Sequence, residues 1–384
     1  MPNTSETSLP APIIVTSVDQ LQECAHQLKD CDAIALDTEF MRTDTFFPIL
    51  GLVQIYNGEK CWLIDPLAVS DLSALAEILT DSGIIKVFHS CSEDLEVLKH
   101  VLDCVPEPLF DTQVAAAFSG YGFSKGYAGL VEVMLGIPVA KGETRSDWLQ
   151  RPLSESQLGY AALDVIHLLP VYRRLCENLA DLGRSEWVDE EMQGLVAKAS
   201  GSEVLAEYFL KVKGAWQLDP HSLAALRLLC EWREIEARDR NRPRGRVIGD
   251  KTLLDIVTKT PQSNHDLSDI EGMHPGLIRR YSETLFELLQ NGLATPLLDC
   301  PETLPEPLPR QAGDRIKQLK KIVNTRAELL DLPPEVLARK RDIEFLVRQV
   351  IEQDRACLPD TIALGWRFDV IGEPLLEAAT KLVR

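Results

Sequence analysis

The stretch that most constrains the fold of this chain is residues 33–40, with the sequence AIALDTEF. It begins as a short apolar run, which is typical of a buried strand. Because successive side chains of a strand point to opposite faces, Asp37 and Glu39 share one face at the end of this strand. Acids beside a core need a paired charge or a metal, and hard divalent cations prefer carboxylate oxygens. We therefore expect a cation site at this point.

The bulk composition is typical of a globular protein of two or three domains. The chain has 384 residues, of which 45% are hydrophobic and 26% are charged, and no apolar run approaches the roughly 20 residues of a membrane-spanning helix. The N-terminus has no pattern of a secretory signal. The 9 cysteines are scattered and never spaced C-x-x-C, which indicates reduced thiols. We expect a cytoplasmic protein without membrane contact.

The first half of the chain alternates strand-like and helix-like patterns. Strands are expected at 13–16, 33–40, 50–56, 61–64 and 84–88, and helices at 18–28, 71–79, 92–102, 154–182 and 185–199. Asn57-Gly58 is a hairpin signal, so the first strands are predicted to form an antiparallel meander. Ser92 and Ser154 are expected to cap their helices. Alternating strands and helices favour an α/β layer fold.

The second half reads as helical throughout. We predict a flexible N-terminus at 1–12, an α/β domain at 13–205, a helical domain at 211–292, a Pro-rich linker at 293–312 and a second helical domain at 313–384. Five prolines between 296 and 309 are too dense for a regular element.

Three further features converge on the first pair of acids. Asp94 lies in the first turn of a helix that follows a buried strand. Tyr160 and Asp164 are four residues apart on the predicted helix 154–182, so both project from one helix face. Asp111 lies at a strand-to-helix junction and is read as a helix cap. Alone, each feature has a plain structural explanation: a solvated strand end, a helix-dipole residue, or a half-buried ring beside a solvated acid.

Taken together and in order, these features resemble the exonuclease superfamily that has four acidic ligands and a catalytic tyrosine. More narrowly, they resemble the ribonuclease D family. The resembling stretches are 36–40, 89–98, 147–153 and 157–165. In the second half, residues 213–216, 232–233, 242–246 and 274–276 resemble a first helicase-and-RNase-D C-terminal (HRDC) domain, and 364–367 resembles a second, divergent copy.

The resemblance implies a ribonuclease H-like mixed sheet flanked by helices, followed by two small all-α HRDC-type domains. It also implies that four acids ligate two Mg²⁺ or Mn²⁺ ions and that Tyr160 positions the attacking water; the four acids are Asp37, Glu39, Asp94 and Asp164. Two such ions suit phosphodiester hydrolysis, because they acidify a water and stabilise the leaving oxygen. With an unperturbed pKa of about 10, a tyrosine orients water better than it acts as a base.

Residues that contact the substrate are less specified. Five residues in or near the resembling stretches 36–40 and 89–98 are predicted to bind the terminal nucleotides: Thr38, Phe40, Met41, Gln54 and His89. For Phe40 a core-packing role, and for His89 a structural role, remain open. The formal net charge of −19 opposes phosphate binding, so positive charge must be local. An arginine-rich run supplies it, and Arg242, Arg244 and Arg246 are predicted to contact RNA; a solvated, ion-paired run is the alternative.

The sequence therefore predicts a metal-dependent 3′–5′ exoribonuclease that releases nucleoside 5′-monophosphates. The resemblance implies RNA with a free 3′ end as substrate, especially transfer RNA precursors, and no obligate protein partner is evident. Three alternatives stay open at this point. They are an exonuclease of single-stranded DNA, a non-catalytic nucleic-acid-binding scaffold, and a structural Ca²⁺ site.

Overall fold

The structure of the protein, a computed structural model, describes residues 10–139, 142 and 146–383. The described residues fall into two compact units. Unit 1 takes them from Met1–Met41, Leu50–Gly201 and Leu308–Arg384, and unit 2 from Arg42–Ile49 and Ser202–Pro307. Across these described ranges, no helix combines the length and the apolar character needed to cross a membrane. All nine cysteines, each in the described part of the chain, are free thiols.

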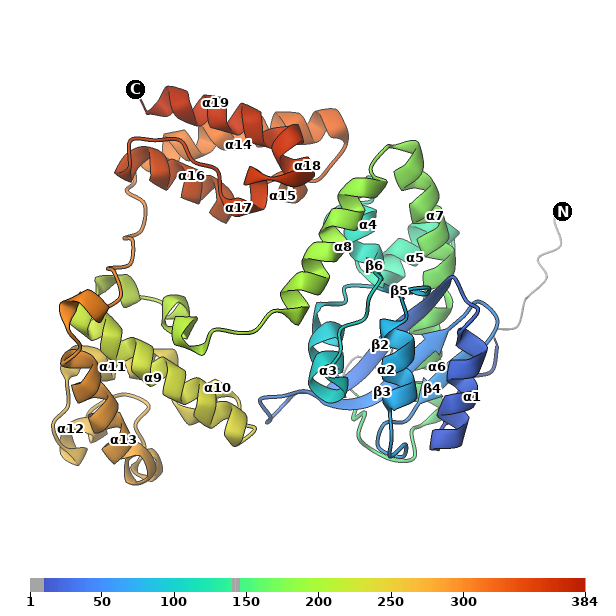
Figure 1. Cartoon of the computed structure of the whole chain (residues 1–384), viewed down its shortest axis with the longest axis horizontal. Helices are drawn as coiled ribbons and strands as arrows, with labels where there is room; N and C mark the ends of the chain where they lie inside the picture. Colours follow the sequence, from blue (N-terminus) through green and yellow to red (C-terminus); the bar gives the residue numbers. More distant parts are fainter. Residues whose placement is uncertain (1–9, 140–141, 143–145, 384) are drawn as a thin grey trace. The chain divides into compact units, whose positions relative to one another are not determined.

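Unit 1 is built on one mixed sheet (Figure 1). Its strands are β1 (Ile13–Val15), β2 (Ala33–Met41), β3 (Ile49–Tyr56), β4 (Cys61–Ile64), β5 (Ile85–Phe88) and β6 (Leu109–Asp111), and they lie in the order β1-β4-β3-β2-β5-β6. β2 pairs with β5, and β5 with β6, in parallel. β3 and β4 form the predicted antiparallel hairpin. The expected meander is wrong for β1, which pairs with β4 in parallel.

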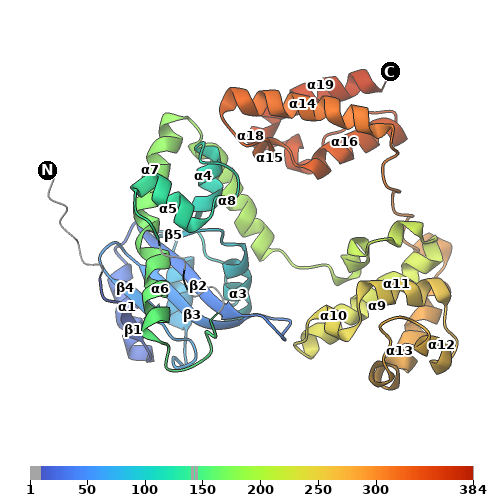
Figure 2. The same ribbon diagram turned by 180° about the vertical axis from the view of Figure 1, so that it is seen from behind.

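Helices cover both faces of this sheet. Between residues 18 and 200 they are α1 (Val18–Leu28), α2 (Ser73–Thr80), α3 (Ser92–Leu102), α4 (Thr112–Phe118), α5 (Tyr127–Leu135), α6 (Glu155–Ile166), α7 (Leu168–Asp181) and α8 (Ser185–Ser200). Residues of α1, α2 and α3 share a core with Ile34 and Leu36 of β2. Residues of α4 to α8 share another with Ala35 on the opposite face. Figures 1 and 2 show these two sets from opposite sides.

Side-chain caps define several of these helix ends. The Asp111 carboxylate accepts hydrogen bonds from the backbone N–H groups of Gln113 and Val114, which confirms it as the cap of α4. Ser154 and Gln157 form a capping box at the start of α6, as the Ser154 prediction requires. The prediction for α3 is wrong by one residue, because the N-cap is Cys91, without a side-chain cap bond, and Ser92 is the first helical residue.

The predicted single helix 154–182 is also wrong. The structure has two helices, α6 and α7, that meet at His167. Pro170 lies in the first turn of α7. A proline has no N–H for the carbonyl four residues earlier, and its ring clashes with that carbonyl, so a continuous helix through Ile166 is excluded.

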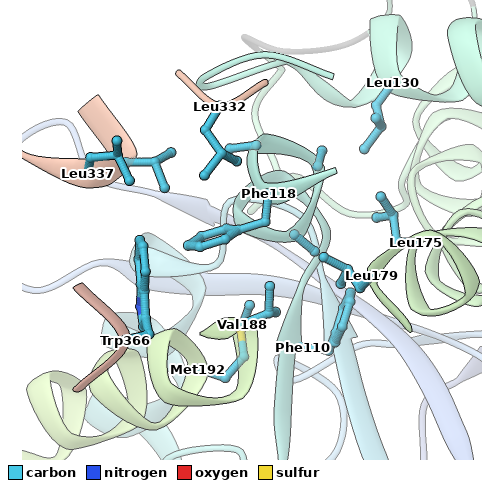
Figure 3. Close-up of a cluster of buried hydrophobic side chains, with 14 of the residues drawn as sticks. Phe110, Phe118, Leu130, Leu175, Leu179, Val188, Met192, Leu332, Leu337 and Trp366 are labelled. Carbon is cyan, nitrogen blue, oxygen red and sulfur yellow. The ribbon is translucent and has the colours of Figure 1, made fainter. Parts of the chain in front are cut away.

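The C-terminal helices belong to unit 1. They are α14 (Ala312–Leu330), α15 (Pro334–Leu337), α16 (Lys340–Glu352), α17 (Asp360–Ala363), α18 (Gly365–Arg367) and α19 (Glu373–Leu382), with one π-helical turn at Phe368–Gly372. Trp366 stacks on Trp187 of α8 with ring centroids 4.9 Å apart, and meets Phe118 of α4 edge to face. Figure 3 shows Trp366 and Phe118 in one buried cluster with Leu332 and Leu337. The C-terminal segment therefore shares a hydrophobic core with α4 and α8, which cover the sheet.

Unit 2 is helical. Its elements are α9 (Pro220–Asp239), α10 (Arg244–Val247), α11 (Asp250–Lys259), α12 (Asn264–Ser268) and α13 (Pro275–Leu293), with short 3₁₀ turns at Leu205–Lys211, Ala215–Gln217 and Leu297–Asp299. α9 packs along α13. The fold class predicted from the sequence, a mixed sheet flanked by helices and followed by helical segments, is confirmed.

Candidate active site

Asp37 and Glu39 lie on one face of β2, as the period of a strand requires. This is the face of Ala35, whose side chain joins the core with α4 to α8. One carboxylate oxygen each from Asp37, Glu39 and Asp164 lies within 4.8 Å of the other two. Three acids from two distant segments therefore meet at one point, close enough to share a cation.

Asp164 and Tyr160 come from α6, which packs against β2. They lie one helical turn apart, and the Tyr160 hydroxyl interacts with the Asp164 carboxylate and lowers its pKa, although burial raises that pKa overall. The tyrosine ring lies 6.2 Å from the ring of Trp148, measured between centroids. The Gln157 side chain donates to the Asp147 carbonyl at 3.1 Å, so the segment before α6 is fixed to the helix.

Asp94 reaches the site from the opposite layer. It lies in the first turn of α3 and is buried. Its Oδ1 accepts a hydrogen bond of 2.5 Å from the hydroxyl of Thr38, the residue between the two acids of β2. The charge of Asp94 contributes to the raised pKa values of Asp37 and Glu39. All four predicted acids therefore interact, with Asp94 outside the closest group of three.

The four acids bring like charges together in a buried setting. Burial is the main cause that raises the pKa of Asp94 to about 6, of Asp164 to about 7 and of Glu39 to about 8. Burial and then the three neighbouring carboxylates raise the pKa of Asp37 well above its ordinary range. Clustered like charges out of water are unfavourable unless a cation joins them. Hard oxygen ligands without histidine or thiolate suit Mg²⁺ or Mn²⁺.

The predicted substrate residues of β2 and β3 differ in burial. Phe40 is half-buried and packs against the core shared with α1 to α3, and Met41 is half-buried at the end of β2. Gln54 is fully buried on β3, and neither atom of its amide group has a hydrogen-bond partner among the described residues. An unpaired buried amide is costly, so Gln54 marks a position with unused hydrogen-bonding capacity.

His89 follows β5 and is held by its neighbours. Its Nδ1 lies 2.9 Å from the Thr112 hydroxyl, and its ring meets the Tyr127 ring edge to face at 5.7 Å between centroids. Burial lowers the pKa of His89 below its ordinary value. The side chain is therefore a neutral, packed group at ordinary pH.

The arginine-rich run forms an ion-pair network within unit 2. Arg244 Nε lies 2.6 Å from the carboxylate of Glu234, a fully buried residue, and Arg238 lies 2.7 Å from the same group. Arg242 and Arg246 have exposed side chains, and Arg246 lies 3.8 Å from Asp44. The three predicted RNA contacts thus differ: Arg244 is engaged with a buried acid, and the other two face solvent.

Sequence reasoning missed Tyr127, the first residue of α5. Its hydroxyl donates to the Leu163 carbonyl at 2.5 Å, one residue before Asp164. Burial, and then the charges of Asp164 and Asp37, raise the pKa of this phenol. No local pattern pointed to this contact, because the two residues are 36 positions apart.

Comparisons with known proteins agree with this geometry. Residues 12–180 match the family described as 3′–5′ exonuclease, and residues 222–289 match the HRDC domain. Ribonuclease D of Pseudomonas paraeruginosa is 45% identical over 345 residues, which cover 90% of this chain and 91% of that protein. The chain belongs to the ribonuclease D family. Ribonuclease D of Escherichia coli strain K12 is 36% identical over 373 residues, which cover 94% of this chain and 96% of that protein.

The fold is also that of a solved ribonuclease D. The crystal structure of Escherichia coli RNase D, an exoribonuclease involved in structured RNA processing, matches with a TM-score of 0.88 and 34% identity. The match covers 96% of this chain and 98% of that chain. This ribonuclease D family member is therefore a 3′–5′ exoribonuclease, a phosphodiester hydrolase whose domain depends on divalent metal.

Proposed function

We propose that this ribonuclease D family member removes nucleotides from the 3′ end of RNA by a two-metal-ion mechanism and releases nucleoside 5′-monophosphates. The observation that carries the proposal is the group of carboxylate oxygens of Asp37, Glu39 and Asp164 within 4.8 Å of one another. Asp94 completes the set of ligands, with its carboxylate oriented by Thr38. When bound, a pair of Mg²⁺ or Mn²⁺ ions would acidify the attacking water and stabilise the leaving 3′ oxygen.

Tyr160 orients the attacking water in this proposal. Burial and the charge of Asp164 raise the pKa of Tyr160 above its ordinary value, so the phenol stays protonated at neutral pH. A protonated phenol donates one hydrogen bond and accepts others, and it interacts with the Asp164 carboxylate one helical turn away. The tyrosine therefore holds a fixed direction relative to the ligand group, which is the requirement for an in-line attack.

The proposed substrate is RNA with a free 3′ end, including transfer RNA precursors. Phe40, Met41, Gln54 and His89 would contact the terminal nucleotides, because they lie on or directly after strands that bear or neighbour the acids. The unpaired amide of Gln54 supports a polar contact there. In unit 2, the exposed Arg242 and Arg246 would contact phosphates, and Arg244 would hold the turn through Glu234.

Digestion of a 5′-labelled transfer RNA with a 3′ extension tests the proposal. With Mg²⁺ or Mn²⁺ we expect stepwise shortening and nucleoside 5′-monophosphates by mass spectrometry, and with EDTA no turnover. A 3′-phosphorylated RNA and a DNA strand of the same sequence serve as controls. Nucleoside 3′-monophosphates, activity that persists in EDTA, or equal rates on DNA would contradict the mechanism or the substrate class.

Asp164→Asn is the matched variant for the metal assignment. Because it removes one ligand charge and keeps the side-chain volume, we expect a loss of about 1000-fold or more in kcat with the fold retained. Tyr160→Phe should lower kcat strongly and leave RNA affinity nearly unchanged. A variant at Asp164 that turns over at a near-normal rate would remove this carboxylate from the ligand set.

A further inference from the structure

The turn of α6 that carries Asp164 is the last turn of that helix. α6 ends at Ile166, and α7 begins at Leu168. The last four carbonyls of an α-helix have no partner within the helix. In α6 these carbonyls belong to residues 163–166, and Pro170 supplies no N–H to the last of them. The carbonyls of the turn that carries the proposed metal ligand therefore need hydrogen-bond donors from outside α6.

Tyr127 supplies a hydrogen bond to this turn from another helix. Its hydroxyl donates to the Leu163 carbonyl at 2.5 Å. The backbone N–H of His167 is directed at the Val165 carbonyl and not at Leu163, and it also acts on the Tyr127 hydroxyl, where it lowers a pKa that burial raises overall. In a continuous helix the His167 N–H would bond Leu163 directly. The phenol thus replaces, at the Leu163 carbonyl, the donor that the helix break removes.

The position of Tyr127 is itself fixed. It is the first residue of α5, after the N-cap Gly126, and its ring packs against His89, which follows β5. The Gln113 side chain donates to the Lys125 carbonyl at 3.2 Å, which secures the segment before α5. The Tyr127 ring is therefore positioned by contacts outside α6. A fixed donor can define where the last turn of α6 lies.

We propose that Tyr127 is a positioning residue for Asp164: its hydroxyl caps the last turn of α6 and sets the distance of the Asp164 carboxylate from Asp37 and Glu39. This inference rests on the proposed role of Asp164 as a metal ligand. Groups behind the ligands of a metal typically change affinity by about 10- to 100-fold when they are removed. The bond to the Leu163 carbonyl places the Tyr127 hydroxyl one residue from Asp164 along α6.

The test is Tyr127→Phe, which keeps the ring and removes only the hydroxyl. Mn²⁺ binding is measured on the full chain without RNA, by calorimetry or by the loss of the free Mn²⁺ electron paramagnetic signal. We expect Mn²⁺ affinity to fall about 10-fold or more. In activity assays the Mn²⁺ concentration at half-maximal rate should rise by the same factor, and kcat at saturating Mn²⁺ should stay within about threefold because all ligands remain.

Tyr121→Phe is the matched control. The Tyr121 hydroxyl accepts a hydrogen bond of 3.1 Å from the Asn178 side chain and is half-buried in the same unit, so its loss has a comparable structural cost. We expect unchanged Mn²⁺ affinity in this variant. Equal Mn²⁺ affinity of Tyr127→Phe and wild type, or an equal loss in both variants, would overturn the positioning role.

Asp164→Asn separates this failure from a failure of the proposed function. One outcome is that wild type and Tyr127→Phe bind Mn²⁺ equally well and Asp164→Asn loses Mn²⁺ binding. The metal site then stands, and only the inference about Tyr127 is wrong. If Asp164→Asn binds Mn²⁺ as wild type does, Asp164 is no ligand, and the proposed function and the inference both fail.

Discussion

The hydroxyl of Thr38 donates to the Asp94 carboxylate at 2.5 Å and so joins β2 to the first turn of α3. Thr38 stands between Asp37 and Glu39, and its side chain points to the other face of β2, towards the layer of α3. One tripeptide therefore provides two candidate ligands on one face and orients a third from the other. This explains how acids from opposite sides of a sheet can act together.

Thr38→Val tests this relationship. Valine keeps the volume and removes the donor, so Asp94 loses a bond that lowers its pKa, which burial already raises to about 6. We expect Mn²⁺ affinity to fall about 10- to 100-fold and the acidic limb of the pH–rate profile to move to higher pH. Thr38→Ser retains the hydroxyl and should remain near wild type. If the acidic limb of the pH–rate profile were the same in Thr38→Val as in wild type, the orienting role of Thr38 would be contradicted.

The metal-free protein should lose stability as pH rises from about 4, the pKa of acids in an unfolded chain, to about 8, the folded value of Glu39. Asp94, Asp164 and Glu39 have pKa values of about 6, 7 and 8 in the folded chain, against about 4 for acids in an unfolded chain. The native state therefore binds more protons, and stability falls as these groups ionise. Melting curves of the EDTA-treated protein across this range measure the effect.

Asp37→Asn provides the comparison for the pH effect. It removes one of the mutually repelling charges, so its melting temperature should fall less than that of wild type between about pH 4 and pH 8. Saturating Mn²⁺ should abolish most of the wild-type decline, because the ion binds the ionised carboxylates. If the melting temperatures of wild type and Asp37→Asn declined equally with pH, ionisable groups outside this site would dominate the pH dependence of stability.

The acids that the structure brings together could be selected from the sequence because each belongs to a short local pattern. Two of these patterns can be recognised without tertiary information. One is a strand that ends in Asp37-Thr38-Glu39, and the other is a helix with an acid four residues after a tyrosine. The break between α6 and α7 also had a local signal, Pro170, which the continuous apolar pattern of 154–182 obscured. In contrast, the bond from Tyr127 to Leu163 could not be predicted, because it joins segments that only the fold brings together.

The arginine-rich run shows a second limit of sequence reasoning. Composition alone does not distinguish an arginine that faces solvent from one that neutralises a buried acid. Glu234 is fully buried and lies next to three arginines in space: Arg233, Arg238 and Arg244. The positive charge available to RNA in this run is therefore smaller than the count of arginines indicates.

Glu234→Gln should destabilise unit 2. The change removes the buried carboxylate that pairs with Arg238 and Arg244. Because these arginines are 19% and 44% exposed and Arg238 also pairs with Glu203, we expect a cost of about 1–3 kcal/mol. Hydrogen exchange of α9 and α10 in the full chain should show faster exchange, with α6 unaffected. Arg246→Gln is the control, since Arg246 is 73% exposed. It should leave exchange unchanged and weaken RNA binding, with a smaller salt dependence.

Trp366→Ala should destabilise the contact of the C-terminal segment with α8. The side chain is 4% exposed, stacks on Trp187 and donates to the Glu191 carboxylate at 3.0 Å. Loss of a buried tryptophan costs about 3–5 kcal/mol. We expect a lower melting temperature and faster proteolysis within 308–384. Leu364→Ala, at a position 79% exposed, should change neither. Equal melting temperatures of Trp366→Ala and wild type would contradict a shared core, because a side chain that stabilises both segments cannot be removed without cost.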